Sequence, residues 1–214
     1  MTELVLNTFF RSSAAWRVRI ALRLKGLSYS TVYRNFREQA QRTPDHLALN
    51  PQGLVPTLVA DGVPFGQSLA IIEYLDEIHV DPPLLPDDPI GRAQVRAMAQ
   101  IVACDIHPIG NLRVLQYLRT EFGQDKDSVN AWYRHWVKQG FDALEALARA
   151  QGNGRHCHGD RVSIADICLV PQMYNARRFG ADLNPYPTLR AIDAHLTALP
   201  AFAETAPERQ PDAV

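Results

Sequence analysis

The sequence has few cysteines, no long apolar run and almost no net charge. Its 214 residues include three cysteines, too few to form a disulfide framework in a chain of this length. No segment approaches the roughly 20 consecutive apolar residues that a membrane-spanning helix needs. A net charge of −1 gives no general attraction to nucleic acid or to an anionic membrane. With 46% hydrophobic residues, the composition indicates a globular protein that binds neither nucleic acid nor membrane.

Targeting and metal-binding signals are also missing. The N-terminus carries Glu3 and continues as the apolar run 4–6, which is typical of a strand rather than a secretory signal. We therefore expect a cytoplasmic protein. The string His156-Cys157-His158 suggests a metal site at first sight, but it lacks a second pair of ligands at a suitable spacing. We expect no metal.

The first 80 residues combine short strand patterns with helical ones. Asp61-Gly62 separates two strand patterns and predicts a tight hairpin, and Gly26 predicts the end of the preceding helix. The expected elements are a strand at 3–8, a helix at 15–25, a strand at 29–33, a hairpin at 57–65 and a helix from Gln67-Ser68. This is the order of a thioredoxin-like α/β domain.

A change of composition follows. The proline-rich segment 79–88 indicates a linker, and Asp88-Pro89 favours a helix start, an N-cap followed by proline at the first helical position. Apolar stripes at helical spacing continue from there, and the tail from Pro200 is expected to be irregular. The expected division is a thioredoxin-like domain over 1–80, a linker over 81–88 and an all-helical domain over 89–214.

Two further local patterns are informative, one for folding and one for ligand binding. Ser163 stands three residues before Asp166 and just ahead of an apolar run, which resembles a capping box with a folding role. Basic residues without any acid gather over 11–25. For three of them, Arg19, Arg23 and Lys25, we expect a solvated helix face, whereas Arg11 beside a serine-bearing turn is a candidate for binding an anion.

Three segments of the first domain carry a specific family resemblance. They are the turn Phe10-Arg11-Ser12-Ser13-Ala14-Ala15-Trp16-Arg17, the loop Asn50-Pro51-Gln52-Gly53-Leu54-Val55-Pro56-Thr57-Leu58, and Gln67-Ser68. Together they resemble the glutathione-binding half of the glutathione transferases, and the serine turn is similar to that of the zeta class. The resemblance extends over nearly the whole chain.

The resemblance implies which part of glutathione these segments contact. It implies a cis Val55-Pro56 bond, with the Val55 backbone pairing with the cysteinyl unit, and it implies that Gln67 and Ser68 hold the γ-glutamyl carboxylate. A helix N-terminus attracts carboxylates through its free N–H groups and dipole, so the last role also has a physical basis. Simple helix capping by Ser68, or a strand-entry role for Pro56, is the alternative.

Ser12 and Ser13 lie where a first helix would offer its N–H groups to a sulfur. Lowering a thiol pKa by two units takes about 2.7 kcal/mol. A hydrogen bond to a charged group contributes roughly 1.5–3 kcal/mol, so one hydroxyl plus the helix dipole suffices. The alternative is that both serines only cap the helix. Zeta-class members commonly have cysteine where this chain has Ala14, which shifts weight to Ser12 and Arg11.

In the second domain the string from Cys104 to Asn111 is similar to one in bacterial maleylacetoacetate and maleylpyruvate isomerases. The resemblance implies that His107 and Asn111 approach glutathione and that Asp105 reaches its ammonium group. It further implies that Arg113 and Arg178 bind substrate carboxylates, a task that suits guanidinium groups. Packing or surface positions are the alternatives for these residues.

The function that follows is a glutathione-dependent cis–trans isomerisation of a small dicarboxylic keto acid. The leading hypothesis is conversion of maleylacetoacetate to fumarylacetoacetate by reversible thiolate addition, with catalytic Ser12, Ser13 and Arg11 and a homodimer with its cleft between the two domains. The same chemistry on maleylpyruvate, and a general transferase that conjugates electrophiles, are alternatives. A noncatalytic binding module is a third alternative, which the serine turn disfavours.

Overall fold

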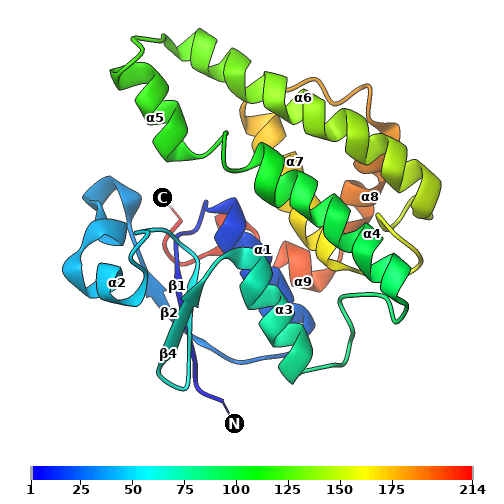
Figure 1. Ribbon diagram of the computed structural model, residues 1–214, viewed down its shortest axis with the longest axis horizontal. Helices are drawn as coiled ribbons and strands as arrows, with labels where there is room; N and C mark the ends of the chain where they lie inside the picture. Colours follow the sequence, from blue (N-terminus) through cyan, green and yellow to red (C-terminus); the bar gives the residue numbers. More distant parts are fainter. Residues whose placement is uncertain (1, 214) are drawn as a thin grey trace. The chain divides into compact units, whose positions relative to one another are not determined.

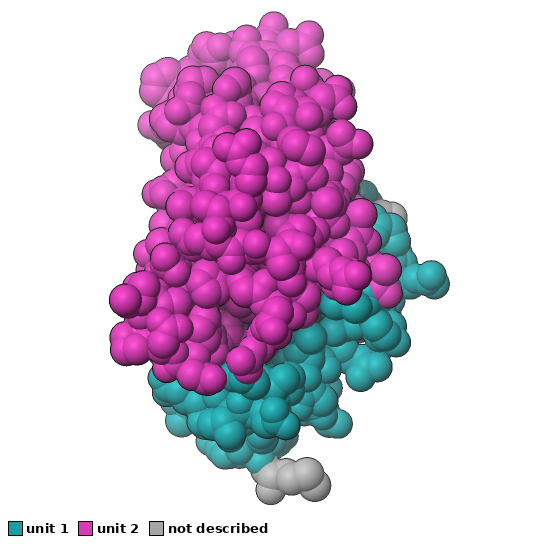
Figure 2. All heavy atoms as spheres, turned by 90° about the vertical axis from the view of Figure 1, so that its right-hand side faces the viewer, with its two compact units in different colours: residues 1–83, 199–214 teal, residues 84–198 magenta. Residues whose placement is uncertain are grey.

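The computed structural model describes residues 2–213, which divide into two separately packed units (Figure 2). The first unit consists of residues 1–83 and 199–214, and the second of residues 84–198. Residues 199–213 therefore pack with the first unit, whereas the expected division put them in the all-helical domain over 89–214.

A four-stranded mixed sheet forms the centre of the first unit (Figure 1). Its strands are β1 (Leu4–Thr8), β2 (Ser30–Tyr33), β3 (Thr57–Ala60) and β4 (Val63–Gly66), in the spatial order β2-β1-β3-β4. β1 runs parallel to β2 and antiparallel to β3, and β3 is antiparallel to β4. Asp61 and Gly62 both have positive φ in the β3–β4 turn, so the predicted hairpin is confirmed.

The helices of the first unit are α1 (Ser13–Leu24), α2 (Pro44–Leu49), α3 (Ser68–Ile78) and α9 (Pro200–Ala203). α1 packs against both α3 and α9, which brings the C-terminal segment to the N-terminal helix. The sequence did not predict α2, whose six residues are too short to show a helical period. The tail expected to be irregular contains α9 and a 3-10 turn, Pro207–Arg209.

The basic face of α1 differs from the expectation of a solvated surface. Arg19 is 1% exposed and Lys25 is 8% exposed. The Lys25 ammonium group is held by Asp76 and by the carbonyls of His79 and Pro82. Arg23 does lie at the surface, paired with Glu204. The prediction was wrong for two of the three residues because their partners come from segments distant in the sequence.

Helices make up the second unit, as predicted. They are α4 (Pro89–Gln100), a π-helical segment (Ile101–Ile106), α5 (Leu112–Thr120), α6 (Lys126–Gln151), α7 (Ile164–Arg178) and α8 (Pro187–Thr197). Asp88 caps α4 by accepting a hydrogen bond from the Gly91 amide at 2.8 Å. α7 contacts both α4 and α8, and it is buried throughout its first ten residues.

The capping box at the start of α7 is confirmed. Asp166 is fully buried, and its carboxylate accepts hydrogen bonds from the Ser163 amide and hydroxyl at 2.8 and 2.9 Å. Its other oxygen accepts the Cys157 amide at 2.7 Å. Asp166 thus joins the loop before α7 to the helix itself, which explains its folding role.

The part of the chain that the structure describes contains neither a membrane-spanning helix nor a cluster of metal ligands. Within residues 2–213, no helix is both long and apolar enough to cross a bilayer. No cluster of three or more His, Cys, Asp or Glu side chains in the same part of the chain is arranged to hold a metal ion.

Candidate functional site

The strand register brings the three segments of the first unit to one edge of the sheet. Asn7, next to the end of β1, pairs with Thr57 at the start of β3, and Thr57 pairs with Gly66 at the end of β4. The serine turn follows β1, Val55-Pro56 precedes β3, and Gln67-Ser68 follows β4. Hydrogen bonding across β1, β3 and β4 therefore places these segments side by side.

Ser12 is the N-cap of α1. Its hydroxyl oxygen accepts a hydrogen bond from the Ala15 amide at 3.2 Å, and its own amide donates to the Phe9 carbonyl at 3.0 Å. Capping uses an acceptor lone pair of the hydroxyl and leaves its hydrogen available to another acceptor. Capping and stabilisation of an anion by Ser12 are therefore compatible.

The neighbours of Ser12 differ in exposure. Arg11 is exposed, and its guanidinium carbon lies 5.3 Å from the centroid of the Phe10 ring. Ser13 is the first residue of α1 and is only 6% exposed. Ala14 is buried as well. Ser12 and Arg11 thus present the accessible polar groups of this turn.

The loop before β3 is held by a buried amide. Asn50 Nδ2 donates to the Leu54 carbonyl and to the Thr57 hydroxyl, both at 3.0 Å. A ring nitrogen of His46 lies 2.9 Å from the same Leu54 carbonyl. The Val55-Pro56 peptide bond is cis, as the resemblance implied.

Val55 presents unpaired backbone groups at this fixed point. Within residues 2–213, neither its N–H nor its C=O has a hydrogen-bond partner. Such groups can pair with an extended peptide as an added strand would. The geometry is therefore ready for a peptide-like ligand beside β3.

The start of α3 presents groups that are suited to binding an anion. Gln67 is the N-cap residue, with φ of 67°, and Ser68 is the first helical residue rather than the cap. The first amides of the helix have no acceptor within it, so they favour a carboxylate. Gln67 is fixed by a 3.0 Å hydrogen bond from its Nε2 to Gln52 Oε1. The Ser68 hydroxyl accepts from Arg17 Nη1 at 3.2 Å.

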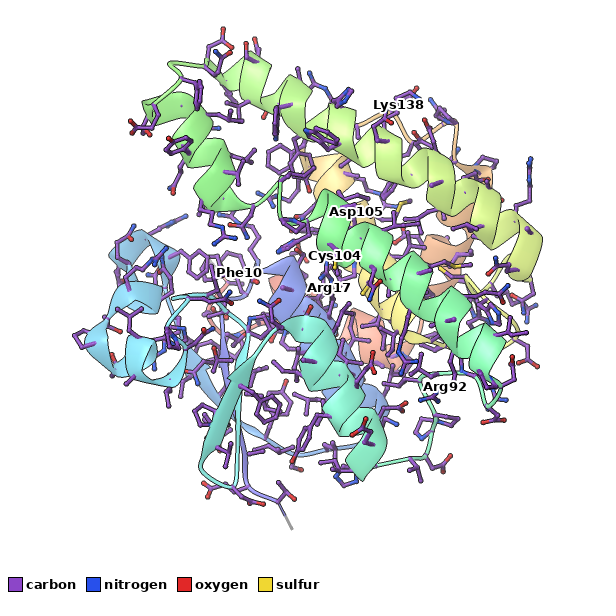
Figure 3. All side chains as sticks on the ribbon, in the orientation of Figure 1. Phe10, Arg17, Arg92, Cys104, Asp105 and Lys138 are labelled. Atoms are coloured by element: carbon purple, nitrogen blue, oxygen red, sulfur yellow. The ribbon has the colours of Figure 1, made fainter. Side chains whose placement is uncertain are left out.

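In the second unit, the π-helical segment carries the predicted acid, and the predicted histidine follows it directly. Cys104 and Asp105 are exposed neighbours on this segment, visible in Figure 3, and His107 follows it half-buried. The His107 amide donates to the Val102 carbonyl, five residues back, at 2.9 Å. π-helical turns occur frequently at functional sites.

Asn111 has a structural task in addition to its predicted one. It is the N-cap of α5, where its Oδ1 accepts from the Arg113 amide at 3.2 Å. A side-chain amide has further hydrogen-bonding capacity, since its NH2 group carries two donors. Capping therefore does not exclude a ligand contact by Asn111.

The two predicted carboxylate-binding arginines are exposed at ends of helices. Arg113 lies in the first turn of α5, and Arg178 is the last residue of α7. Tyr133 of α6 connects their surroundings. Its ring stacks on Phe179 at 3.8 Å between centroids, and it lies where a Cβ on Gly110 would come within 2.6 Å. The segment before α5 and the end of α7 therefore share one packing contact.

Known families match both units. Residues 11–78 match the model of the glutathione S-transferase N-terminal domain, and residues 130–203 match that of the C-terminal domain. A probable maleylacetoacetate isomerase from Vibrio cholerae is 49% identical, with 100% of both chains covered. A solved structure of a maleylpyruvate isomerase, described as a bacterial zeta-class glutathione S-transferase, has a TM-score of 0.96 at 47% identity. This match covers 98% of the present chain and 100% of the solved one. The chain belongs to the zeta class of the glutathione transferases.

A relative of this glutathione transferase has been solved with glutathione bound. The maleylacetoacetate isomerase of Anaeromyxobacter dehalogenans, with glutathione in its active site, has a TM-score of 0.90 at 44% identity, and 100% and 99% of the two chains are covered. In the present chain, the unpaired Val55 backbone, the α3 N-terminus and the available Ser12 hydrogen match a peptide unit, a carboxylate and a thiolate. These groups fit glutathione.

Sequence reasoning on this transferase missed two supporting residues. Asn50 is 7% exposed and fixes the carbonyl that precedes Val55, and Arg17 is 1% exposed and reaches Ser68. An Asn-Pro pair ahead of the strand was the available signal for Asn50. Nothing local signals Arg17, because its partner lies 51 residues away.

Proposed function

We propose that this zeta-class transferase is a glutathione-dependent maleylacetoacetate isomerase that forms fumarylacetoacetate. The observation that carries the proposal is the shared sheet edge, where the register of β1, β3 and β4 gathers Ser12, Val55 and Ser68. Full-length similarity to relatives named maleylacetoacetate isomerase supports it. Glutathione would supply a thiol that adds reversibly to the cis double bond and permits rotation about it.

The first unit binds and ionises glutathione in this proposal. The Val55 backbone aligns the cysteinyl unit, and Gln67, Ser68 and the α3 amides hold the γ-glutamyl carboxylate. Ser12 donates its hydroxyl hydrogen to the sulfur, at the positive end of the α1 dipole. The hydrogen bond and the dipole both favour the thiolate over the thiol and so lower the thiol pKa. Ser13 supports the same turn from a buried position.

Arginines and the second unit bind the substrate. Arg11, Arg113 and Arg178 are exposed guanidinium groups that suit a dicarboxylic keto acid, since each can bind a carboxylate through two parallel hydrogen bonds. They also stabilise negative charge that develops on the substrate. Asp105, His107 and Asn111 contribute further contacts to glutathione.

The decisive experiment follows the absorbance of maleylacetoacetate with purified protein, with and without glutathione. We expect turnover only when glutathione is present, with glutathione regenerated at the end. Maleylpyruvate is assayed in parallel, and a strong preference for it would replace the proposed substrate. Net consumption of glutathione with chlorodinitrobenzene, without isomerisation of either acid, would instead indicate a conjugating transferase.

The proposed localisation and oligomeric state follow from the cysteines and from exposed aromatic residues. We propose a cytoplasmic homodimer. Within residues 2–213, no disulfide joins Cys104, Cys157 or Cys168, which suits a reducing compartment. Tyr117 and Phe122 near the end of α5 are 57% and 62% exposed and provide apolar surface for a second copy. Light scattering of the purified protein measures the assembly, and a monomeric mass would contradict the dimer.

A further inference from the structure

The C-terminal tail reaches the turn that carries Ser12. Asp212 Oδ2 accepts a hydrogen bond from the Phe10 amide at 2.9 Å, across 202 residues of sequence. The Phe10 carbonyl accepts from Arg19 Nη2, also at 2.9 Å. Both polar groups of the Phe10 backbone, labelled in Figure 3, are therefore fixed by charged side chains.

Arg19 connects the tail to the same turn. Its Nε donates to the Thr205 carbonyl at 3.2 Å, and its Nη1 donates to the Thr8 hydroxyl at 3.1 Å and to the Phe9 carbonyl at 3.4 Å. The indole N–H of Trp16 adds a bond to the Thr205 hydroxyl at 3.1 Å. The tail and the start of the serine turn thus share one buried guanidinium.

Charge strengthens this connection. Burial lowers the pKa of Arg19 to about 10, whereas the charge interactions with Tyr29 and Asp212 raise it. Arg19 therefore remains cationic at neutral pH. A buried cation needs a compensating anion, and Asp212 supplies a carboxylate from the tail. The Phe9 carbonyl accepts from both Arg19 and the Ser12 amide, so the network ends at Ser12 itself.

We infer that the tail segment 205–212 is a positioning element for the reaction, in which Asp212 holds Phe10 and thereby sets where the Ser12 hydroxyl points. This inference rests on the proposed role of Ser12 in stabilising the glutathione thiolate. A displacement of a catalytic group by about 1 Å can cost on the order of 100-fold in rate. A tail that only adds stability would leave the thiolate unchanged.

The test compares full-length Asp212→Ala, Asp212→Asn and Asp212→Glu with the unmodified protein. The pKa of bound glutathione is read from thiolate absorbance in the ultraviolet, its Kd from calorimetry, and kcat from the isomerase assay. We expect Asp212→Ala to raise the thiol pKa and to lower kcat by about tenfold. The Kd measured below the thiol pKa, where glutathione binds as the thiol, should change little, because Val55 and Ser68 lie on other segments.

The other two variants separate positioning from stability. Asp212→Asn keeps an acceptor for the Phe10 amide and should restore most of kcat. Asp212→Glu keeps the charge but lengthens the side chain, so it should lower kcat with little change in melting temperature, even where Asp212→Ala folds poorly. Glu204→Ala removes an exposed acid that immediately precedes segment 205–212 and pairs with Arg23 at the surface. It should leave the thiol pKa, the Kd, kcat and the melting temperature unchanged.

The outcomes are distinguishable from failure of the proposed function. Absence of thiolate absorbance in the unmodified protein with glutathione would contradict the role of Ser12. A normal thiolate in the unmodified protein, with the same thiol pKa and kcat in Asp212→Ala and Asp212→Glu, would overturn the positioning role alone. A lower melting temperature without a change in thiol pKa would likewise assign the tail a purely structural task.

Discussion

Arg17 donates a hydrogen bond to the Ser68 hydroxyl at 3.2 Å and so joins α1 to the first residue of α3. Arg17 is 1% exposed, and within residues 2–213 its Nε and Nη2 have no hydrogen-bond partner. A buried cation with unpaired donors is costly. It also places positive charge beside the residue that we propose holds the γ-glutamyl carboxylate, which gives the cost a functional reason.

Replacing Arg17 with methionine should therefore weaken glutathione binding about tenfold without destabilising the fold. The reason is that Met removes charge near the carboxylate and also removes unpaired buried donors. Calorimetry gives the Kd and thermal unfolding gives the melting temperature. Arg17→Lys should retain part of the affinity. Arg23→Met, at an exposed position on the same helix, should have no effect on Kd, and equal losses in both Met variants would contradict the prediction.

Two substitutions separate the capping function of the Ser12 hydroxyl from its function as a hydrogen-bond donor. Ser12→Ala should cost about 1 kcal/mol in unfolding free energy, whereas Ser12→Gly should cost only a few tenths, because glycine is tolerated at an N-cap. Both variants lose the hydroxyl hydrogen, so both should lower kcat by roughly 10- to 100-fold. Denaturant titration and the isomerase assay measure the two effects. Near-normal kcat in Ser12→Gly would leave the hydroxyl with capping alone.

Local patterns predicted the elements whose signals lie within a few residues. Asp61-Gly62 fixed the hairpin turn and Asp88-Pro89 the start of α4, because turn and cap geometry depend on adjacent side chains. The spacing of apolar residues in α5 is a weaker indicator of burial, as Leu112 and Leu115 show. Leu115 is buried, but Leu112 is 46% exposed, since spacing alone does not show which face has a packing partner.

Local sequence patterns could not predict contacts between residues that are distant in the sequence. Arg19 looked like a surface residue because its acceptors lie in the turn after β1 and in the tail. The π-helical segment also carried no local signal. It forms where Ile106 packs so closely on α6 that a Cβ at Gly140 would lie 2.3 Å from its Cδ1 atom. Family resemblance, rather than periodicity, identified the candidate site residues.

Because Gly140 packs so closely on Ile106, substitution of Gly140 tests the contact between α6 and the π-helical segment. Glycine to alanine in a helix ordinarily stabilises by up to about 1 kcal/mol. Here the added methyl group must displace Ile106, so Gly140→Ala should destabilise by about 1–3 kcal/mol. It should also lower isomerase activity, since Asp105 and His107 flank Ile106. Gln139→Ala on the exposed face should stay within about 0.5 kcal/mol of the unmodified protein. Stabilisation by Gly140→Ala would contradict the close approach.

His156 should make the stability of the protein fall as the solution becomes acidic. Burial lowers its pKa from the usual 6.5, and the neighbouring His195 and Arg155 act in the same direction, while Asp166 and Asp160 oppose them. As the pH falls, His156 therefore takes up a proton at a higher pH in the unfolded chain than in the folded protein. The contribution of His156 to the unfolding free energy should be fully present above pH 6.5. Below this pH it should decline by at most about 1.4 kcal/mol per pH unit.

The measurement is urea unfolding at pH values from neutral down to about 5. His156→Leu cannot take up this proton, so its unfolding free energy should vary less with pH over this range than that of the unmodified protein. The comparison cancels titrations that both proteins share, such as that of buried Asp166, whose raised pKa has the opposite effect on stability at lower pH. His135→Gln, at an exposed position on α6, should keep the original slope. Parallel curves for His156→Leu and the unmodified protein would mean that His156 is charged as easily in the folded state as in the unfolded one.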